Sequence, residues 1–150
     1  APPRQDARAV EARADILVYT GEPLTRALDI LGDVRAVLPV RLVTVSVDLV
    51  VRLCDVDPAG VSRPVCDGVM RVRSDDDATV SLVPTGYRFL AGHRLLVHVA
   101  RGAFPRYARD FGTTEAIADA HGLAPSRCVL PHEQRCPPHL VLPLFESNSP

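Results

Sequence analysis

The sequence has no lysine and no tryptophan, and aromatic residues make up only 5% of its 150 residues. Its 17 basic side chains are therefore all Arg, and the net charge is −1. Because a nucleic-acid-binding surface usually shows a basic excess, we expect no nucleic-acid partner. Arg-only usage favours bidentate ion pairs, but the codon bias of a GC-rich, bacterial genome explains it more simply. The shortage of aromatic rings for sugar stacking argues against a carbohydrate-binding module.

Cysteines and long apolar runs are also scarce. Four cysteines in 150 residues are too few for a disulfide-stabilised scaffold. No apolar run is long enough to cross a bilayer, and the polar residues 1–6 lack the apolar stretch of a signal peptide. We therefore expect reduced thiols, a cytoplasmic location and no membrane partner, although a domain cut from a longer protein would lose any targeting segment.

The sequence contains no Gly-x-Ser-x-Gly motif. In α/β-hydrolases that motif places the nucleophilic serine on a strained turn between a strand and a helix. Ser46 and Ser81 both stand between apolar residues in strand-like segments. We therefore assign no catalytic residue to this chain.

Hydrophobic residues alternate with a period of two along most of the chain. The clearest runs are rich in Val and cover residues 34–43, 47–56, 95–100 and 140–145. Asp-Pro-Ala-Gly at 57–60 predicts a turn, so residues 47–56 and 63–73 should form a hairpin. Pro39 is expected at a sheet edge or a bulge, because it cannot donate a hydrogen bond.

One segment alone has a helical pattern, and it predicts a short helix near residues 113–121. Many short strands with frequent turns predict an all-β fold, an antiparallel β-sandwich. We expect an N-terminal lead-in at 1–14, the sandwich domain at 15–146 and a tail at 147–150.

Short motifs follow one another in an order that is more specific than any single motif. They are DARAVEAR at residues 6–13, DILVYTGEPL at 15–24, LCDV at 53–56, PAG at 58–60, CDG at 66–68 with Arg71, YRFLAGHRL at 87–95, FPRYARD at 104–110 and HLVLP at 139–143. In this order the sequence resembles the C-terminal domain of the X-Pro dipeptidyl-peptidase and cocaine-esterase-like serine hydrolase family.

The resemblance implies a jelly-roll sandwich of the galactose-binding-like kind. In that family the domain packs against an α/β-hydrolase domain, which carries the Ser-Asp-His triad. The expected partner is therefore an α/β-hydrolase domain of the same or a neighbouring chain, whose active-site cleft this domain would help to shape. Homo-oligomer contacts are a further option, and no cofactor is expected. Whether the chain belongs to an enzyme stays open, because it lacks the triad.

The sequence departs from the family pattern in three places. The family domain begins further upstream, residues 73–79 are shorter than the family's insertion, and apolar residues replace a polar family loop at 41–49. The chain is thus expected to be either a fragment or a diverged standalone relative. A standalone relative could use the apolar stretch as a pocket for a small hydrophobic molecule, for example in natural-product biosynthesis. The candidate lining residues are Leu42, Val45, Val47 and Leu49.

Two clusters contain metal-ligand residue types, but we predict no metal at either. The first has zinc-type ligands at a spacing that matches no common zinc module, and a disulfide between its two cysteines is an alternative. The second surrounds one hairpin and could hold calcium, although carboxylates that cap turns are commoner. The first cluster is Cys128, His132, Cys136 and His139, and the second is Asp55, Asp57 and Asp67.

Residues 104–110 combine aromatic, Arg and Asp side chains, which are frequent at interfaces and pocket rims. Anchoring of a loop is the simpler explanation of the same residues. The candidate rim residues are Phe104, Arg106, Tyr107, Arg109 and Asp110. His93 is expected as a turn residue rather than a general base.

Cys54 and Cys66 flank the predicted hairpin turn. Pairing about the turn would place Cys54 opposite Arg63 and Cys66 opposite Val51. We therefore expect two buried thiols rather than a disulfide.

Overall fold

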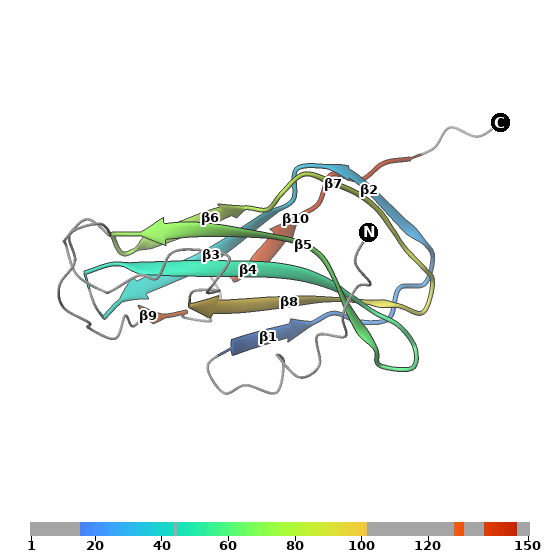
Figure 1. Ribbon diagram of the computed structural model, residues 1–150, viewed down its shortest axis with the longest axis horizontal. Coiled ribbons are helices and arrows are strands. Elements are labelled where there is room, and N and C mark those ends of the chain that lie inside the picture. The colour runs from blue at the N-terminus through green and yellow to red at the C-terminus, as the bar shows by residue number, and fades with distance from the viewer. Residues whose placement is uncertain (1–15, 44, 102–127, 131–136, 147–150) are drawn as a thin grey trace.

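The computed structural model describes residues 16–43, 45–101, 128–130 and 137–146. All regular secondary structure in these ranges is β-strand, which confirms the predicted all-β class. The short helix predicted near 113–121 lies outside the described residues. Within them, no helix has the length and apolarity needed to span a membrane. The strands (Figure 1) are β1 (Ile16–Thr20), β2 (Leu28–Gly32), β3 (Arg35–Leu42), β4 (Val47–Val56), β5 (Ser62–Val72), β6 (Asp76–Ser81), β7 (Thr85–Phe89), β8 (Arg94–Arg101), β9 (Cys128–Val129) and β10 (His139–Val141).

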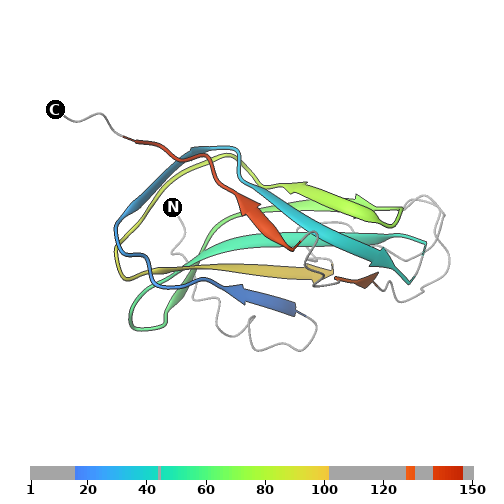
Figure 2. The same ribbon diagram turned by 180° about the vertical axis from the view of Figure 1, so that it is seen from behind.

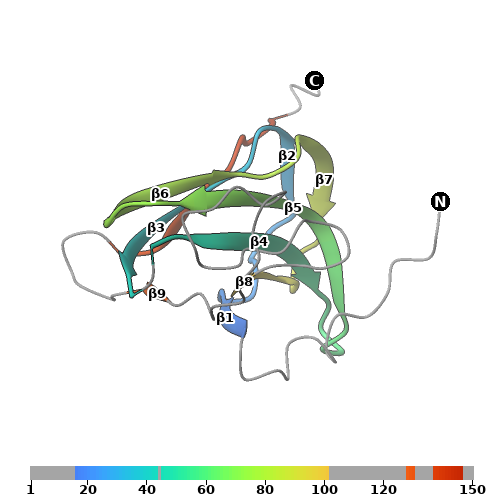
Figure 3. The same cartoon turned by 60° about the vertical axis from the view of Figure 1, so that its left-hand side comes forward.

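Two antiparallel sheets pack face to face, which confirms the predicted sandwich. One sheet has the order β1-β8-β4-β5, and the other has the order β10-β3-β6 with β9 also paired to β3. Figures 1 and 3 show β4, β8 and β1 on one side of the sandwich and β3 and β6 on the other. A smaller sheet of β2 and β7 continues the structure at one end.

The core lies between the sheets and follows from the alternation of side chains along each strand. The odd-numbered residues of β4 from Val47 to Leu53 and the even-numbered residues of β3 from Ala36 to Val40 are at most 3% exposed. They belong to one cluster of buried apolar side chains. Ile30 of β2 and Phe89 of β7 extend this cluster beneath the smaller sheet.

Pro39 lies in the middle of β3, at a point where one side of the strand is locally open, which agrees in part with the expected edge position. On one side it faces Asp77 of β6. On the other side β10 pairs with residues 35–37 and β9 with residues 41–42. Among the described strands β3 therefore has no partner on that side at residues 38–40. A residue without an N–H group sits where the pairing is interrupted.

β4 and β5 form the predicted hairpin, but the expected register was wrong. Cys54 lies opposite Pro64 instead of Arg63, and Cys66 lies opposite Leu53 instead of Val51. The pairing shifts between Leu53 and Cys54, and a regular hairpin scheme cannot anticipate such an irregularity. Neither cysteine forms a disulfide, as expected, although Cys66 is only half-buried.

Candidate functional site

The carboxylate of Asp55 is the centre of a polar network at one end of the sandwich. The Tyr87 hydroxyl donates to Asp55 Oδ2 at 2.6 Å, and His93 Nδ1 lies 2.8 Å from Oδ1. Asp55 is only 5% exposed, so these donors replace the water that the carboxylate loses on folding. The network joins the end of β4 to residues 32 and 38 positions away in the sequence.

The turn before β8 and the segment around Leu24, which follows β1, hold this network in place. Gly92 has a φ of 84°, a left-handed conformation that favours glycine. Its N–H donates to Leu24 O at 2.8 Å, and the N–H of Leu24 donates to His93 O at the same distance. The Tyr87 ring packs edge-on against Phe89, with 4.8 Å between ring centroids. Figures 1 and 2 show the β4–β5 loop and the β7–β8 turn at the same end of the molecule.

An ion pair braces the loop of the same hairpin. Arg63 Nη1 donates to Asp57 Oδ2 at 2.9 Å, and the N–H of Val61 donates to Asp57 Oδ1 at 2.9 Å. These hydrogen bonds, above all that from Arg63, lower the pKa of Asp57. The same contact with Asp57 raises the pKa of Arg63. The loop is therefore fixed from within as well as by the network.

A second row of polar contacts crosses β4 and β5 on the face turned away from the core. Arg71 donates to both carboxylate oxygens of Asp48, at 2.7 and 2.8 Å. Arg52 Nη2 donates to Asp67 Oδ2 at 3.4 Å. Asp48 and Asp67 are 7% and 5% exposed, so each buried carboxylate has a guanidinium partner. The contact between Arg71 and Asp48 is bidentate, the kind of ion pair that the use of Arg in place of Lys favours.

Gly68 ends the Cys-Asp-Gly motif, and its surroundings explain why this position is glycine. A Cβ atom built there would lie 2.1 Å from Ser81 O and 2.9 Å from Leu82 Cα. Both are backbone atoms, so no side-chain movement can relieve the contact. The neighbouring N–H of Val83 donates to Asp67 O at 2.9 Å, which ties the chain after β6 to β5. Only glycine lets these two backbones approach so closely.

Cys66 is unsuited to nucleophilic chemistry. Burial, and to a smaller extent the charge of Asp67, raise the pKa of its thiol to about 11. Because the thiolate is the reactive form, the thiol is essentially un-ionised near neutral pH. The buried Cys54 has its sulfur 3.9 Å from His98 Nδ1.

The three carboxylates considered for calcium do not share one site. Asp55 is bonded to Tyr87 and His93, Asp57 to Arg63, and Asp67 to Arg52. Within the described ranges no group of three or more potential ligands is arranged to hold a metal ion. Of the zinc-type cluster, His132 and Cys136 lie outside the described residues. Nδ1 of His139 lies 2.9 Å from Pro137 O.

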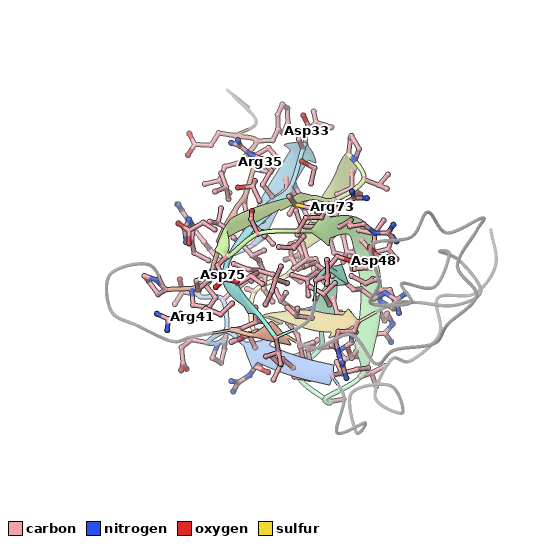
Figure 4. All side chains as sticks on the ribbon, turned by 90° about the vertical axis from the view of Figure 1, so that its left-hand side faces the viewer. Asp33, Arg35, Arg41, Asp48, Arg73 and Asp75 are labelled. Atoms are coloured by element: carbon pink, nitrogen blue, oxygen red, sulfur yellow. The ribbon has the colours of Figure 1, made fainter. Side chains whose placement is uncertain are left out.

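The four candidate pocket residues lie in different surroundings. Val47 and Leu49 belong to the core, Leu42 packs against it, and Val45 is 54% exposed. Asp75 accepts a hydrogen bond from the N–H of Leu42 at 2.7 Å, joining the ends of two strands. Figure 4 looks onto this end of the sandwich, with Asp75 and Asp48 labelled. The candidate rim residues Phe104, Arg106, Tyr107, Arg109 and Asp110 lie outside the described residues.

Sequence reasoning missed the role of Tyr87 and the pairing of His93 with Asp55. Nothing in local spacing links these residues, because the β4–β5 hairpin supplies Asp55, whereas β7 and the turn before β8 supply Tyr87 and His93. The only available signal was that both segments carry motifs of the same family. The pair orients an imidazole as a catalytic dyad would, but its described contacts include no serine, threonine or cysteine. The arrangement holds two loops together.

Comparison with known proteins gives one consistent result. A family profile described as the X-Pro dipeptidyl-peptidase C-terminal non-catalytic domain matches residues 4–134. The cocaine esterase of Rhodococcus sp. (strain MB1 Bresler) is 29% identical over 157 residues, which cover 94% of this chain and 27% of the esterase.

Solved structures with the same fold belong to equally long chains. An aminopeptidase from a marine sediment Thaumarchaeota archaeon superposes with a TM-score of 0.84 at 23% identity, over 95% of this chain and 28% of its own. A selenomethionine-labelled α-amino acid ester hydrolase gives 0.83 at 25% identity, over 95% of this chain and 27% of its own. The chain thus spans little more than a quarter of the length of these relatives.

Proposed function

Because the chain belongs to the family of X-Pro dipeptidyl-peptidase C-terminal non-catalytic domains, we propose that it packs on an α/β-hydrolase domain and shapes that domain's active-site cleft. The hydrolase domain would be part of the same chain or of a neighbouring one. The relatives, which are longer hydrolases, support a partner of this kind.

The network around Asp55 is the observation that carries the proposal. It joins two family motifs, residues 53–60 and 87–95, into one braced end of the sandwich. A wall of a cleft must keep its shape while substrate binds, and a buried carboxylate with a hydrogen-bond partner on each oxygen contributes to that rigidity. Since the described contacts of His93 include no nucleophile, the chemistry is left to the partner.

Further features belong to the same proposal. They are jelly-roll connectivity of the galactose-binding-like kind, a bacterial source, a cytoplasmic location and the absence of a cofactor. The unoxidised thiols of Cys54 and Cys66 accord with a reducing compartment. Homo-oligomer contacts remain a second option for the surface that the hydrolase leaves uncovered.

The experiment uses the full product of the gene that carries this chain or, where the hydrolase is encoded separately, a mixture of the two chains. We expect the 150-residue chain alone to turn over neither p-nitrophenyl acetate nor Ala-Pro-p-nitroanilide. We expect the hydrolase to gain thermal stability and a lower KM when the chain is bound.

Asp55→Asn is the diagnostic variant, because it removes the charge that organises the braced end. It should raise KM more than it lowers kcat. Asp33→Asn, which changes an exposed carboxylate outside this network, is the matched control. The proposal would be overturned if the isolated chain turned over either substrate and a serine-directed reagent abolished that turnover. It would also be overturned if the Tm and KM of the hydrolase were the same with and without the chain.

A further inference from the structure

The sheet of β2 and β7 has a third, short strand-like neighbour. Leu144 forms an antiparallel bridge with Ile30. The N–H of Leu31 donates to Pro143 O at 3.0 Å, and the N–H of Phe145 donates to Asp29 O at 2.9 Å. Residues 143–145 therefore lie along the edge of β2 that β7 leaves unpaired.

This small sheet has two different faces. Because side chains alternate along a strand and cross-strand neighbours share a face, Ile30 and Phe89 point into the core. Six residues point the other way in two rows of three, one residue from each segment. We call them the β2–β7 outer face: Phe145, Asp29 and Arg88 in one row, and Pro143, Leu31 and Gly86 in the other.

Large apolar side chains on this face are open to solvent. Leu31 is 59% exposed and Phe145 is 50% exposed. A Cβ atom added at Gly86 would lie 3.3 Å from Leu31 Cδ1, so the Leu31 side chain lies across the glycine. Leu144, which pairs with Ile30 and so does not belong to this face, is also 61% exposed. Exposed apolar side chains gathered on one flat face indicate a binding surface more than scattered ones do.

An ordered ion pair stands beside the apolar residues. Arg88 Nε and Nη2 donate to the two oxygens of Asp29 at 2.6 and 2.8 Å. This contact lowers the pKa of Asp29 and raises that of Arg88. An exposed pair contributes little to stability, but it fixes the plane of the guanidinium. Nη1 has no partner among the described residues and is free to donate to an acceptor on another surface.

The inner side of β7 makes this face rigid. Tyr87, between Gly86 and Arg88 on the same strand, donates to Asp55 through its hydroxyl. β7 is therefore tied to the braced end of the sandwich. The β6 edge of the β10-β3-β6 sheet is different, since Asp75 and Asp77 place acidic residues at the start of that strand, and charged edges discourage association.

We propose that the β2–β7 outer face is the surface through which this chain docks on the hydrolase part of its family. The inference rests on the proposed function and names the contact surface. Relatives in which a domain of this fold makes up only 27–28% of a hydrolase chain supply the occupant. The complementary surface is apolar opposite Leu31 and Phe145, with a carboxylate or main-chain carbonyl opposite Arg88. Phe and Arg, as at Phe145 and Arg88, are enriched at protein interfaces relative to the rest of the surface.

The first test is hydroxyl-radical footprinting read by mass spectrometry. The isolated chain is compared with the full gene product or with the mixture of this chain and the separately encoded family hydrolase. We expect oxidation of Leu31 and Phe145 to fall severalfold in the presence of the hydrolase. Oxidation of Val45, which is 54% exposed at the opposite end of the sandwich, should not change.

The second test measures association with variants of the same face. Leu31→Glu and Phe145→Glu should each weaken binding of the hydrolase by about tenfold or more, and Val45→Glu is the matched control. The Tm of each isolated variant checks its folding, and Arg88→Ala serves where Leu31→Glu lowers that Tm. Where the chain and the hydrolase are parts of one polypeptide, no binding constant can be measured, and the effect of each variant on the Tm of the hydrolase domain is compared instead.

The outcomes separate this inference from the proposed function. If the hydrolase protects other residues of the chain but leaves Leu31 and Phe145 as reactive as in the isolated chain, the docking face is wrong and the proposed function stands. If the chain and the hydrolase neither protect nor stabilise each other, both proposals fail. Protection of Leu31 and Phe145 at high concentration without any hydrolase would identify a second copy of this chain as the occupant and would also overturn the inference.

Discussion

Replacing Gly68 with alanine should force β5 away from the chain that follows β6. The new Cβ would lie 2.1 Å from the Ser81 carbonyl oxygen, whereas a carbon and a carbonyl oxygen that are not bonded approach to about 3.3 Å. The backbones must therefore move apart by roughly 1 Å. Such a movement would lengthen the bond from Val83 N–H to Asp67 O, now 2.9 Å.

The magnitude follows from three contributions. Overpacking costs about 1–3 kcal/mol, and loss of the hydrogen bond adds about 0.5–1.5 kcal/mol. Alanine restricts the unfolded chain and so offsets about 0.4–1 kcal/mol. These contributions centre the net loss of unfolding free energy at ~2 kcal/mol, within a range of about 0.5–4 kcal/mol, a large share of the ~5–15 kcal/mol that holds a typical domain folded.

Urea unfolding followed by far-ultraviolet circular dichroism measures this loss, since the sequence has no tryptophan for fluorescence. The midpoint should fall at an unchanged m-value. Gly21→Ala is the control, because its Cβ would lie at an ordinary 3.4 Å from Leu95 O. A Gly68→Ala protein within about 0.5 kcal/mol of the wild type would refute the reasoning about close backbone approach.

Three further predictions concern single side chains. Val45→Asp should be tolerated because Val45 is 54% exposed, whereas Val47→Asp, at 0% exposure, should lower the free energy of unfolding by several kcal/mol in urea. Equal effects of the two variants would contradict the assignment of Val47 to the core. Saturable binding of a naphthalene sulfonate by the folded protein would instead support the predicted small-molecule pocket. Tyr87→Phe should cost about 1–3 kcal/mol, because it leaves Asp55 with one donor fewer; an unchanged urea midpoint would show that water replaces the hydroxyl. The raised pKa of Cys66, about 11, should make stability fall as pH rises from the unfolded thiol's pKa of about 8.5 towards 11, because the unfolded thiol ionises first. Cys66→Ser should remove that part of the pH dependence, and an identical pH profile in the variant would count against it.

The alternation of apolar residues allowed the strands to be predicted because it depends on local geometry alone. Residues 47–56, for example, were expected as one strand and form β4 with the same bounds. The register of the hairpin was not predictable, because the shift between Leu53 and Cys54 leaves no mark in composition. An error of one residue in the register places a side chain on the wrong face of the sheet, and an error of two residues gives it the wrong neighbour across the strands.

The network at Asp55 could not be found from spacing. Its partners come from β7 and from the turn before β8, and their positions depend on how the sheets pack. A carboxylate in a Leu-Cys-Asp-Val segment is equally consistent with a turn cap, a calcium ligand or a buried acceptor. Only the three-dimensional arrangement of the β4–β5 hairpin and the β7–β8 connection distinguishes these alternatives. The resemblance to a family identified both segments as important but did not connect them.

The pairing of β3 with β10 has a consequence for how the chain is made. β3 spans Arg35–Leu42, yet the strand that pairs with residues 35–37 begins only at His139. β1 likewise pairs with β8, so Ile16 meets Ala100. During synthesis these strands leave the ribosome long before their partners, and contacts between distant residues form slowly. Until residues 139–141 emerge, one edge of β3 is available to other nascent chains. We therefore expect the yield of soluble protein to depend on chaperones and on translation rate more strongly than its final stability would suggest.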